Sequence, residues 1–137
     1  MVTAAVLLAA VGAVEAAAPG SALAANAATA RVATAKGTQL VLTVAKGDSS
    51  GPARRRAVLI CQPAGGTHRQ ARDACTQLAK VGGKFDRLRL DGGMCTMQWD
   101  PVTVTATGRW KGRKVAYRHT FGNACTLSTT TGAVFSL

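Results

Sequence analysis

The stretch PVTVTATGRWKGRKVAYRHTF, residues 101–121, decides the fold because its two halves are predicted to be neighbouring strands of one sheet. Every second residue of 102–110 is apolar or glycine, and large side chains recur at the same interval in 115–121. That period is typical of strands with one buried face. Between the halves, Lys111 and Gly112 predict a two-residue turn in which Gly supplies a positive φ. We therefore predict a β-hairpin.

The length of the turn also predicts the register of this hairpin. A two-residue loop pairs Trp110 with Arg113 and Gly108 with Val115, so that the apolar faces of the two strands coincide. His119 falls on the same face, where we expect a packed side chain rather than a metal ligand or a catalytic base.

Two more strands and a helix are predicted before the hairpin. QLVLTVAKG (39–47) alternates between apolar and other residues, and RAVLICQP (56–63) is rich in strand formers. THRQARDACTQLAKVGG (67–83) predicts a helix that Thr67 caps and Gly82 ends. Small and apolar residues recur on one face of this helix at helical spacing: Ala71, Ala74, Cys75, Leu78 and Val81.

The remaining segments of the domain are short. KFDRLRLDGG (84–93) predicts one helical turn around Phe85 and Leu88. Residues 126–132 are rich in Ser, Thr and Gly and predict a loop, and AVFSL (133–137) predicts a last strand. The predicted fold class is α+β, a five-stranded antiparallel sheet covered by one main and one short helix.

The N-terminal part differs in composition from the domain. Residues 1–24 are mostly Ala, Val and Leu with Glu15 as their one charge, and SALAA (21–25) offers a signal-cleavage pattern after Ala24. The apolar run before Glu15 is shorter than the roughly 20 residues of a membrane-spanning helix. We expect a signal peptide over 1–24, a flexible arm over 25–37, a folded domain over 38–137, and therefore a secreted, extracellular protein.

Export changes the interpretation of the cysteines. An even number in a short exported chain predicts two disulfides, and Cys61, Cys75, Cys95 and Cys125 allow three connectivities. The predicted helix turns Cys75 toward the second strand, where Cys61 could meet it, and in that case Cys95 pairs with Cys125. The spacing of Cys and His predicts no metal site. Because an oxidising compartment removes free thiolates, we also expect no cysteine nucleophile and no enzyme.

The charge of the chain raises a different possibility. Seventeen Lys and Arg against six Asp and Glu give +11, which suggests an anionic partner. However, the cations are scattered apart from residues 54–56 and 111–114, and the six aromatic residues do not interleave with them as a stacking platform would. We therefore expect no nucleic-acid and no membrane partner. A cationic secreted module that binds anionic polymers or surfaces remains the alternative function.

The connection between the helical part and the hairpin, GGMCTMQWDP (92–101), is too apolar for an ordinary loop. A disulfide at Cys95 would tether one side of it, and Pro101 stiffens the other and holds the preceding residue extended. Met97 and Trp99 have little room to turn inward, so we expect both to be exposed. For Met94, burial and exposure are equally open. A rigid, exposed loop with an apolar tip is what a protease binds as a substrate.

Several stretches of the chain resemble the bacterial, Streptomyces-type subtilisin-inhibitor-like family of secreted serine protease inhibitors. They are LVLTVAKG, AVLICQPAGGTHRQARDAC, LAKVGGKFDRL, GGMCTMQWDPVTVTATGRWKGRKVAYRHTFGNAC and AVFSL, and they span 38–137. The resemblance is specific because the cysteine order, Val-Gly-Gly after the helix, Met-Cys-x-x-x-x-Asp-Pro and Trp-x-Gly occur together.

The resemblance implies a five-stranded antiparallel sheet with two helices, no cofactor and no catalytic residue. It also implies the disulfides Cys61–Cys75 and Cys95–Cys125. By the same resemblance the chain forms a homodimer through its sheet, and each subunit binds one subtilisin-like protease.

The resemblance places the reactive bond at Met97–Gln98, with Met97 as the primary specificity residue. Asn123 would support the loop by hydrogen bonding, although an asparagine in a turn is an equally good interpretation, and Pro101 would stiffen it. The residues expected to contact the protease flank the bond: Gly93, Met94, Cys95, Thr96, Trp99 and Asp100.

This chain departs from the family pattern near the bond. Relatives often have Pro where Thr96 stands, an aliphatic residue where Gln98 stands and Tyr where Trp99 stands. We expect Thr96 and Trp99 to set the chain's own specificity.

Overall fold

The predicted hairpin is present with the predicted register. The structure is a computed structural model that describes residues 37–48, 52–53, 55–90 and 92–137. Strands β4 (Val102–Trp110) and β5 (Arg113–Phe121) pair Trp110 with Arg113 and Gly108 with Val115. Lys111 and Gly112 both have positive φ, 46° and 82°, as a two-residue hairpin turn requires.

Three further strands complete one antiparallel sheet. They are β1 (Thr38–Lys46), β2 (Arg55–Cys61) and the two-residue β3 (Gly65–Gly66), and the order across the sheet is β3-β2-β1-β4-β5. β1 lies at the centre, hydrogen-bonded to β2 on one side and to β4 on the other.

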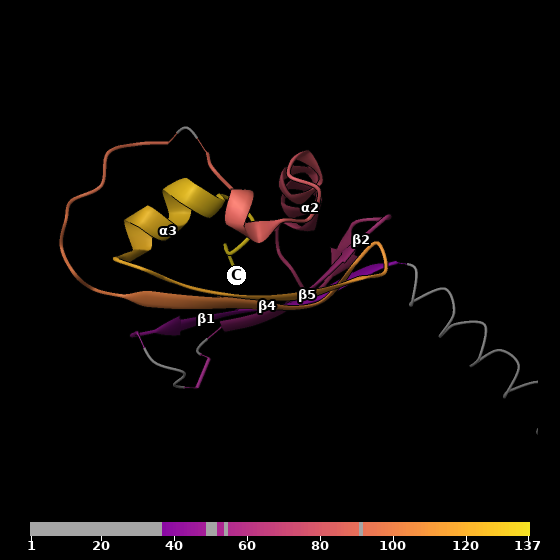
Figure 1. The fold of residues 1–137 in the computed structure, drawn as a ribbon, viewed down its shortest axis with the longest axis horizontal. Helices are drawn as coiled ribbons and strands as arrows, with labels where there is room; N and C mark the ends of the chain where they lie inside the picture. Colours follow the sequence, from indigo (N-terminus) through magenta and orange to yellow (C-terminus); the bar gives the residue numbers. More distant parts are fainter. Residues whose placement is uncertain (1–36, 49–51, 54, 91) are drawn as a thin grey trace, which may run out of the picture.

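The helices lie on one face of this sheet, together with the C-terminal segment (Figure 1). They are α2 (Ala71–Lys80), the 3-10 turn η1 (Phe85–Arg87) and α3 (Ala124–Thr131). The core fills the space between the two layers. Its fully buried side chains include Leu40, Leu42, Leu59, Leu78, Val104 and Val134. The fold class is the one that the sequence predicts, and η1 confirms the predicted helical turn at Phe85.

The prediction for the C-terminal residues was wrong. The expected loop at 126–132 is mostly helix α3, and the expected strand at 133–137 is not a strand. Ala133, Val134 and Phe135 are all buried, and such consecutive burial does not suit a strand with one covered face. Instead, the segment turns across the core, with Val134 N donating to Thr131 O at 3.1 Å.

Two smaller predictions also need correction. Thr67 does not cap α2, because its Oγ1 accepts a hydrogen bond from Val58 N at 2.8 Å and the helix starts only after Gln70. The fifth strand is β3, which pairs with Leu59 and Ile60, and not the predicted strand at 133–137.

The histidine of the hairpin is only partly packed. His119 is exposed, and one side of its ring lies against Phe121 with 4.5 Å between ring centroids.

Two disulfides cross-link the fold. Cys61–Cys75 links β2 to α2, and Cys95–Cys125 links the loop before β4 to the first turn of α3. This is the pairing that the resemblance implies. The predicted signal peptide and nearly all of the predicted arm lie outside the described residues. Within the described part of the chain, every helix is too short or too polar to cross a membrane.

Candidate protease-binding loop

Residues 92–101 form an open loop that arcs around the end of α3 before it enters β4 (Figure 1). Its apolar side chains point into solvent: Met94 is 100% exposed, Met97 97% and Trp99 69%. The exposure expected of Met97 and Trp99 is confirmed, and the open question about Met94 is answered in favour of exposure. A surface that displays three large apolar side chains on one loop is typical of an interaction site.

The entry leg of the loop, residues 92–96, is attached to α3. The disulfide Cys95–Cys125 spans 30 positions of sequence and brings the Cα atoms to 5.7 Å from each other. Cys95 Sγ also lies 3.8 Å from Thr129 Oγ1, one turn further along the helix. This leg is therefore held covalently, by a helix whose own first turn carries the other cysteine.

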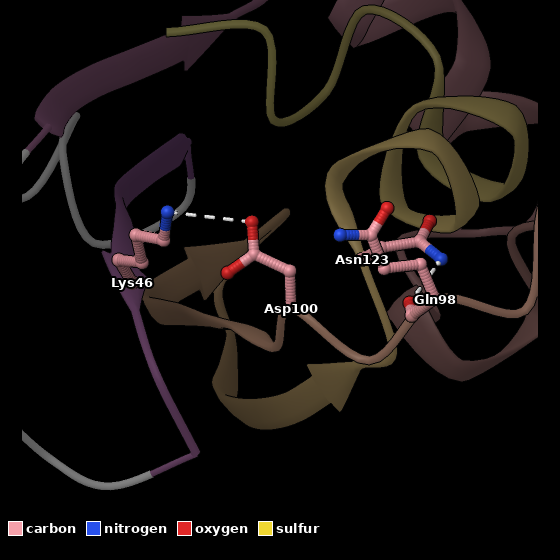
Figure 2. A network of polar contacts seen from close by, with 4 residues as sticks. All are labelled: Lys46, Gln98, Asp100 and Asn123. Carbon is pink, nitrogen blue, oxygen red and sulfur yellow. Dashed lines mark hydrogen bonds and ion pairs between the residues drawn. The ribbon is translucent and has the colours of Figure 1, made fainter.

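The centre of the loop is held by the side chain of Asn123. Its Nδ2 donates to the carbonyl oxygen of Thr96 at 3.0 Å and to that of Gln98 at 2.9 Å. Figure 2 shows the Asn123 amide directed at Gln98. These two carbonyls belong to the residues on either side of Met97, so one side-chain amide spans the peptide bond between Met97 and Gln98.

Asn123 is also the N-cap of α3. Its Oδ1 accepts a hydrogen bond from Thr126 N at 2.9 Å, which satisfies one of the free amides of the first turn. Asn123 therefore hydrogen-bonds to the loop and, in place of a turn, caps a helix. The cap fixes the side-chain orientation that lets Nδ2 reach the loop.

The exit leg, residues 98–101, lies between the ends of two strands. Asp100 N donates to Gly122 O at 2.8 Å, just after β5, and Gly47 N donates to Pro101 O at 2.7 Å, just after β1. Lys46 Nζ lies 3.3 Å from Asp100 Oδ2 (Figure 2). Pro101 thus leads directly into β4, and the exit leg is a continuation of the sheet.

Sequence reasoning missed two contributors to this site, Lys46 and Gly122. Lys46 is 54 positions away from Asp100, and nothing local connects them. The signal that could have found it is the strand register, because Lys46 pairs with Val102, two residues after Asp100. Gly122 accepts the Asp100 N–H and lies beside the Trp99 ring, where a Cβ would be in ordinary contact with Cε3 at 3.7 Å.

Cysteine chemistry is not available at this loop. All four cysteines fall in the described part of the chain, and each is in a disulfide. What the loop can do is present a peptide bond, with an exposed Met97 before it, to another protein.

Comparison with known proteins decides the family. The pattern of the family described as subtilisin inhibitor-like matches residues 36–123, more than half of the chain. The chain belongs to the subtilisin inhibitor-like family. Protease inhibitor SIL-V2 of Streptomyces orinoci is 52% identical over 101 residues, covering 71% of this chain and 93% of that protein. Subtilisin inhibitor-like protein 5 of Streptomyces fradiae is 48% identical, covering 71% of this chain and 94% of that protein.

A solved structure has a similar fold. Sermetstatin of Streptomyces caespitosus, determined in complex with subtilisin of Bacillus licheniformis, superposes with a TM-score of 0.63 at 36% identity. The match covers 72% of this chain and 97% of that one.

Membership of the subtilisin inhibitor-like family confirms the predicted function class. The chain is a protein inhibitor of subtilisin-type serine proteases and not an enzyme. The family assignment also decides between the two functions that the sequence allowed, in favour of the inhibitor over the cationic binding module.

Proposed function

We propose that this chain inhibits subtilisin-like serine proteases by presenting Met97–Gln98 to them as a substrate-like reactive bond. The observation that supports this bond above its neighbours is the position of Met97. Its side chain is 97% exposed, and the carbonyls before and after it are both held by Asn123. On this proposal the protease also contacts the flanking residues Gly93, Met94, Cys95, Thr96, Trp99 and Asp100.

Binding places the Met97 side chain in the primary pocket of the protease. Met is unbranched and apolar, so it suits the broad apolar pocket of subtilisin and not the pocket of trypsin, which takes Lys or Arg. A free peptide would lose conformational entropy on binding, at about 0.5–1.5 kcal/mol for each immobilised side chain. In this loop the disulfide at Cys95 and the hydrogen bonds of Asn123 have already restricted the chain.

Slow release of the cleaved product follows from the same restraints. When the protease serine attacks Met97, the bond to Gln98 breaks and leaves an acyl-enzyme and a new amine. The exit leg stays attached to the sheet, so that amine remains close. It can attack the acyl carbon again, which reforms the C–N bond, breaks the C–O bond to the serine and returns a proton to the serine oxygen.

The test is inhibition of subtilisin, chymotrypsin and trypsin followed by progress curves, with Met97→Asp as the variant. A carboxylate in an apolar pocket should weaken inhibition of subtilisin at least about 30-fold, the lower limit of a binding hot spot. Thr76→Asp is the control, because it adds the same charge on the exposed surface of α2. Equal potency of Met97→Asp and the control would rule out Met97 as the specificity residue.

We also propose that the chain is exported by residues 1–24, carries an arm over 25–37 and folds as an inhibitor domain over 38–137. Mass spectrometry of the protein from culture medium tests the cleavage after Ala24. An N-terminus well inside the domain would contradict it.

A homodimer is proposed through the face of the sheet that lies away from the helices. Val41 and Val58 pair on that face beside Thr107, and Ile60 at its edge is 37% exposed. This apolar strip between strands supports contact with a second copy. Sedimentation should give a dimer mass for the wild type and a monomer mass for Thr107→Glu, and a monomeric wild type would contradict the proposal.

A further inference from the structure

Among the described residues, one ion pair is present, and it lies at the loop. Lys46 Nζ is 3.3 Å from Asp100 Oδ2, with the two side chains 55% and 52% exposed. Asp100 is one of only six acidic residues in a chain with seventeen Lys and Arg. Because acidic residues are scarce in this chain, the placement of this ion pair at the loop points to a role in the loop.

The fold brings Lys46 to the exit leg. Lys46 is the last residue of β1 and pairs with Val102, the first residue of β4. The next residue, Gly47, donates its N–H to Pro101 O at 2.7 Å, so the end of β1 runs beside the exit leg (Figure 2). Lys46 thus reaches Asp100 from one side, while Gly122 O accepts from Asp100 N on the other.

The two legs of the loop are held in different ways. The entry leg has a covalent bond, Cys95–Cys125. The exit leg is held by hydrogen bonds and the ion pair. Its residues 98–100 have no covalent cross-link to the rest of the domain. Once Met97–Gln98 is cut, the new end at Gln98 is held only by these weaker contacts and by the chain that continues through Pro101 into β4.

We propose that Lys46 is a positioning residue for the reactive bond. Through Asp100 it holds the exit leg, so that the amine formed at Gln98 stays within reach of the acyl carbon of Met97. The inference rests on the proposed function, because it assumes cleavage at that bond. Its consequence is that Lys46 lowers the proportion of cut inhibitor at equilibrium without touching the protease pocket.

The expected size of the effect follows from the exposure of the pair. Exposed ion pairs alter an equilibrium by about 1.5- to 5-fold. The ion pair restrains the exit leg, and the cut form gains more conformational freedom than the intact form when this restraint is removed. The loss of Lys46 therefore shifts the equilibrium toward the cut form. Lys46→Met should therefore raise the ratio of cut to intact inhibitor by about 1.5- to 5-fold.

The experiment incubates each variant with a catalytic amount of subtilisin and measures the ratio of cut to intact chains, approached from both the intact and the cut protein. Lys46→Met, Asp100→Asn and the double variant form a double-mutant cycle. Lys46→Arg keeps the charge and should restore the wild-type ratio. Lys80→Met is the matched control, since it removes one exposed lysine from α2, which packs on β2 and β3.

The proposal predicts that both single variants raise the ratio and that the double variant raises it no further. It is overturned if Lys46→Met matches Lys80→Met, or if the two single effects simply add. Thermal unfolding of each variant shows whether the sheet itself has been weakened. A wild-type protein that does not inhibit subtilisin, or that is cut elsewhere, would contradict the proposed function, whereas normal inhibition with an unchanged ratio would contradict this inference alone.

Discussion

At the scale of single residues, Asn123 connects helix and loop through one side chain. Its Oδ1 caps α3 at Thr126 N, and its Nδ2 holds the carbonyls of Thr96 and Gln98. The sequence allowed either role but could not show that both hold, because the loop and the cap are 25 positions or more apart. The amide nitrogen of this one side chain thus donates to the loop, while its oxygen accepts from the helix.

Replacement of Asn123 should separate the two roles. Asn123→Ser keeps a good cap but cannot reach the loop, so the unfolding free energy should change little. Inhibition should weaken about 5- to 150-fold, because two hydrogen bonds of about 0.5–1.5 kcal/mol each are lost. Asn123→Ala should lose the same inhibition and also about 1 kcal/mol of stability. Urea unfolding and progress curves measure the two effects, and equal stability of the Ser and Ala variants would contradict the capping role.

Tyr117, the single tyrosine of the chain, offers a second test at this scale. Burial raises the pKa of its phenol above the usual value near 10; the charge of Asp86 raises it further and that of Arg89 opposes the shift. The neutral phenol therefore contributes stability that is complete below pH of about 10 and is lost as the pH rises through the folded-state pKa. Tyrosinate absorbance should therefore appear at a higher pH in the native protein than in the protein unfolded in urea. Asp86→Asn should reduce the difference in pH between the native and the urea titrations. Native and urea curves that coincide in the wild type would contradict the raised pKa.

At the scale of elements, the sequence predicted those whose period is visible. The hairpin alternates over residues 102–110 and 115–121, and α2 carries its apolar face at helical spacing, so both were predicted correctly. Helix α3 was not, because ACTLSTTT is rich in Thr, which has a low helix propensity. Its stability comes from the Asn123 cap, the disulfide at Cys125 and the buried Leu127, and the last two depend on tertiary contacts that no local pattern shows.

The two glycines after α2 provide a matched pair for substitution. Gly82 and Gly83 both have positive φ, 62° and 75°, but only Gly83 lies against a side chain. A Cβ on Gly83 would come within 2.3 Å of Trp110 Cγ, whereas one on Gly82 would meet nothing within 4 Å. Gly82→Ala should cost about 1 kcal/mol for the backbone, and Gly83→Ala about 2–5 kcal/mol because the buried ring must also move. Urea unfolding measures both, and equal losses would contradict the contact with Trp110.

At the scale of the whole molecule, the loop and its tether could be predicted from the sequence, but the ion pair that supports its exit leg could not. Met97, Trp99, Cys95 and Pro101 lie in one stretch, and the composition of that stretch is unusual by itself. Lys46 reaches the loop only because β1 and β4 pair, which is a property of the assembled sheet.

The two disulfides should contribute similarly to the stability of the protein but differently to inhibition. Their separations of 14 and 30 positions correspond to about 3 and about 3.6 kcal/mol by chain-entropy arguments. Replacing Cys61 and Cys75 by Ser should lower stability and leave inhibition of subtilisin tight wherever the protein is folded. Replacing Cys95 and Cys125 should lower stability by a similar amount and also make inhibition short-lived, because the entry leg is then free.

Urea unfolding and inhibition followed over hours distinguish the two double variants. Equally persistent inhibition by both, under conditions in which both are folded, would show that the covalent tether of the entry leg is not needed.

The direct passage of the loop into β4 has a consequence for behaviour on heating. β4 lies between β1 and β5, so the exit leg cannot lose its shape while that strand remains paired on both sides. A loop joined to the body by flexible peptide would melt first, and such an inhibitor would fail before it unfolds. Here warming should leave the inhibitor fully active up to its cooperative melting transition, and activity and fold should then disappear at the same temperature.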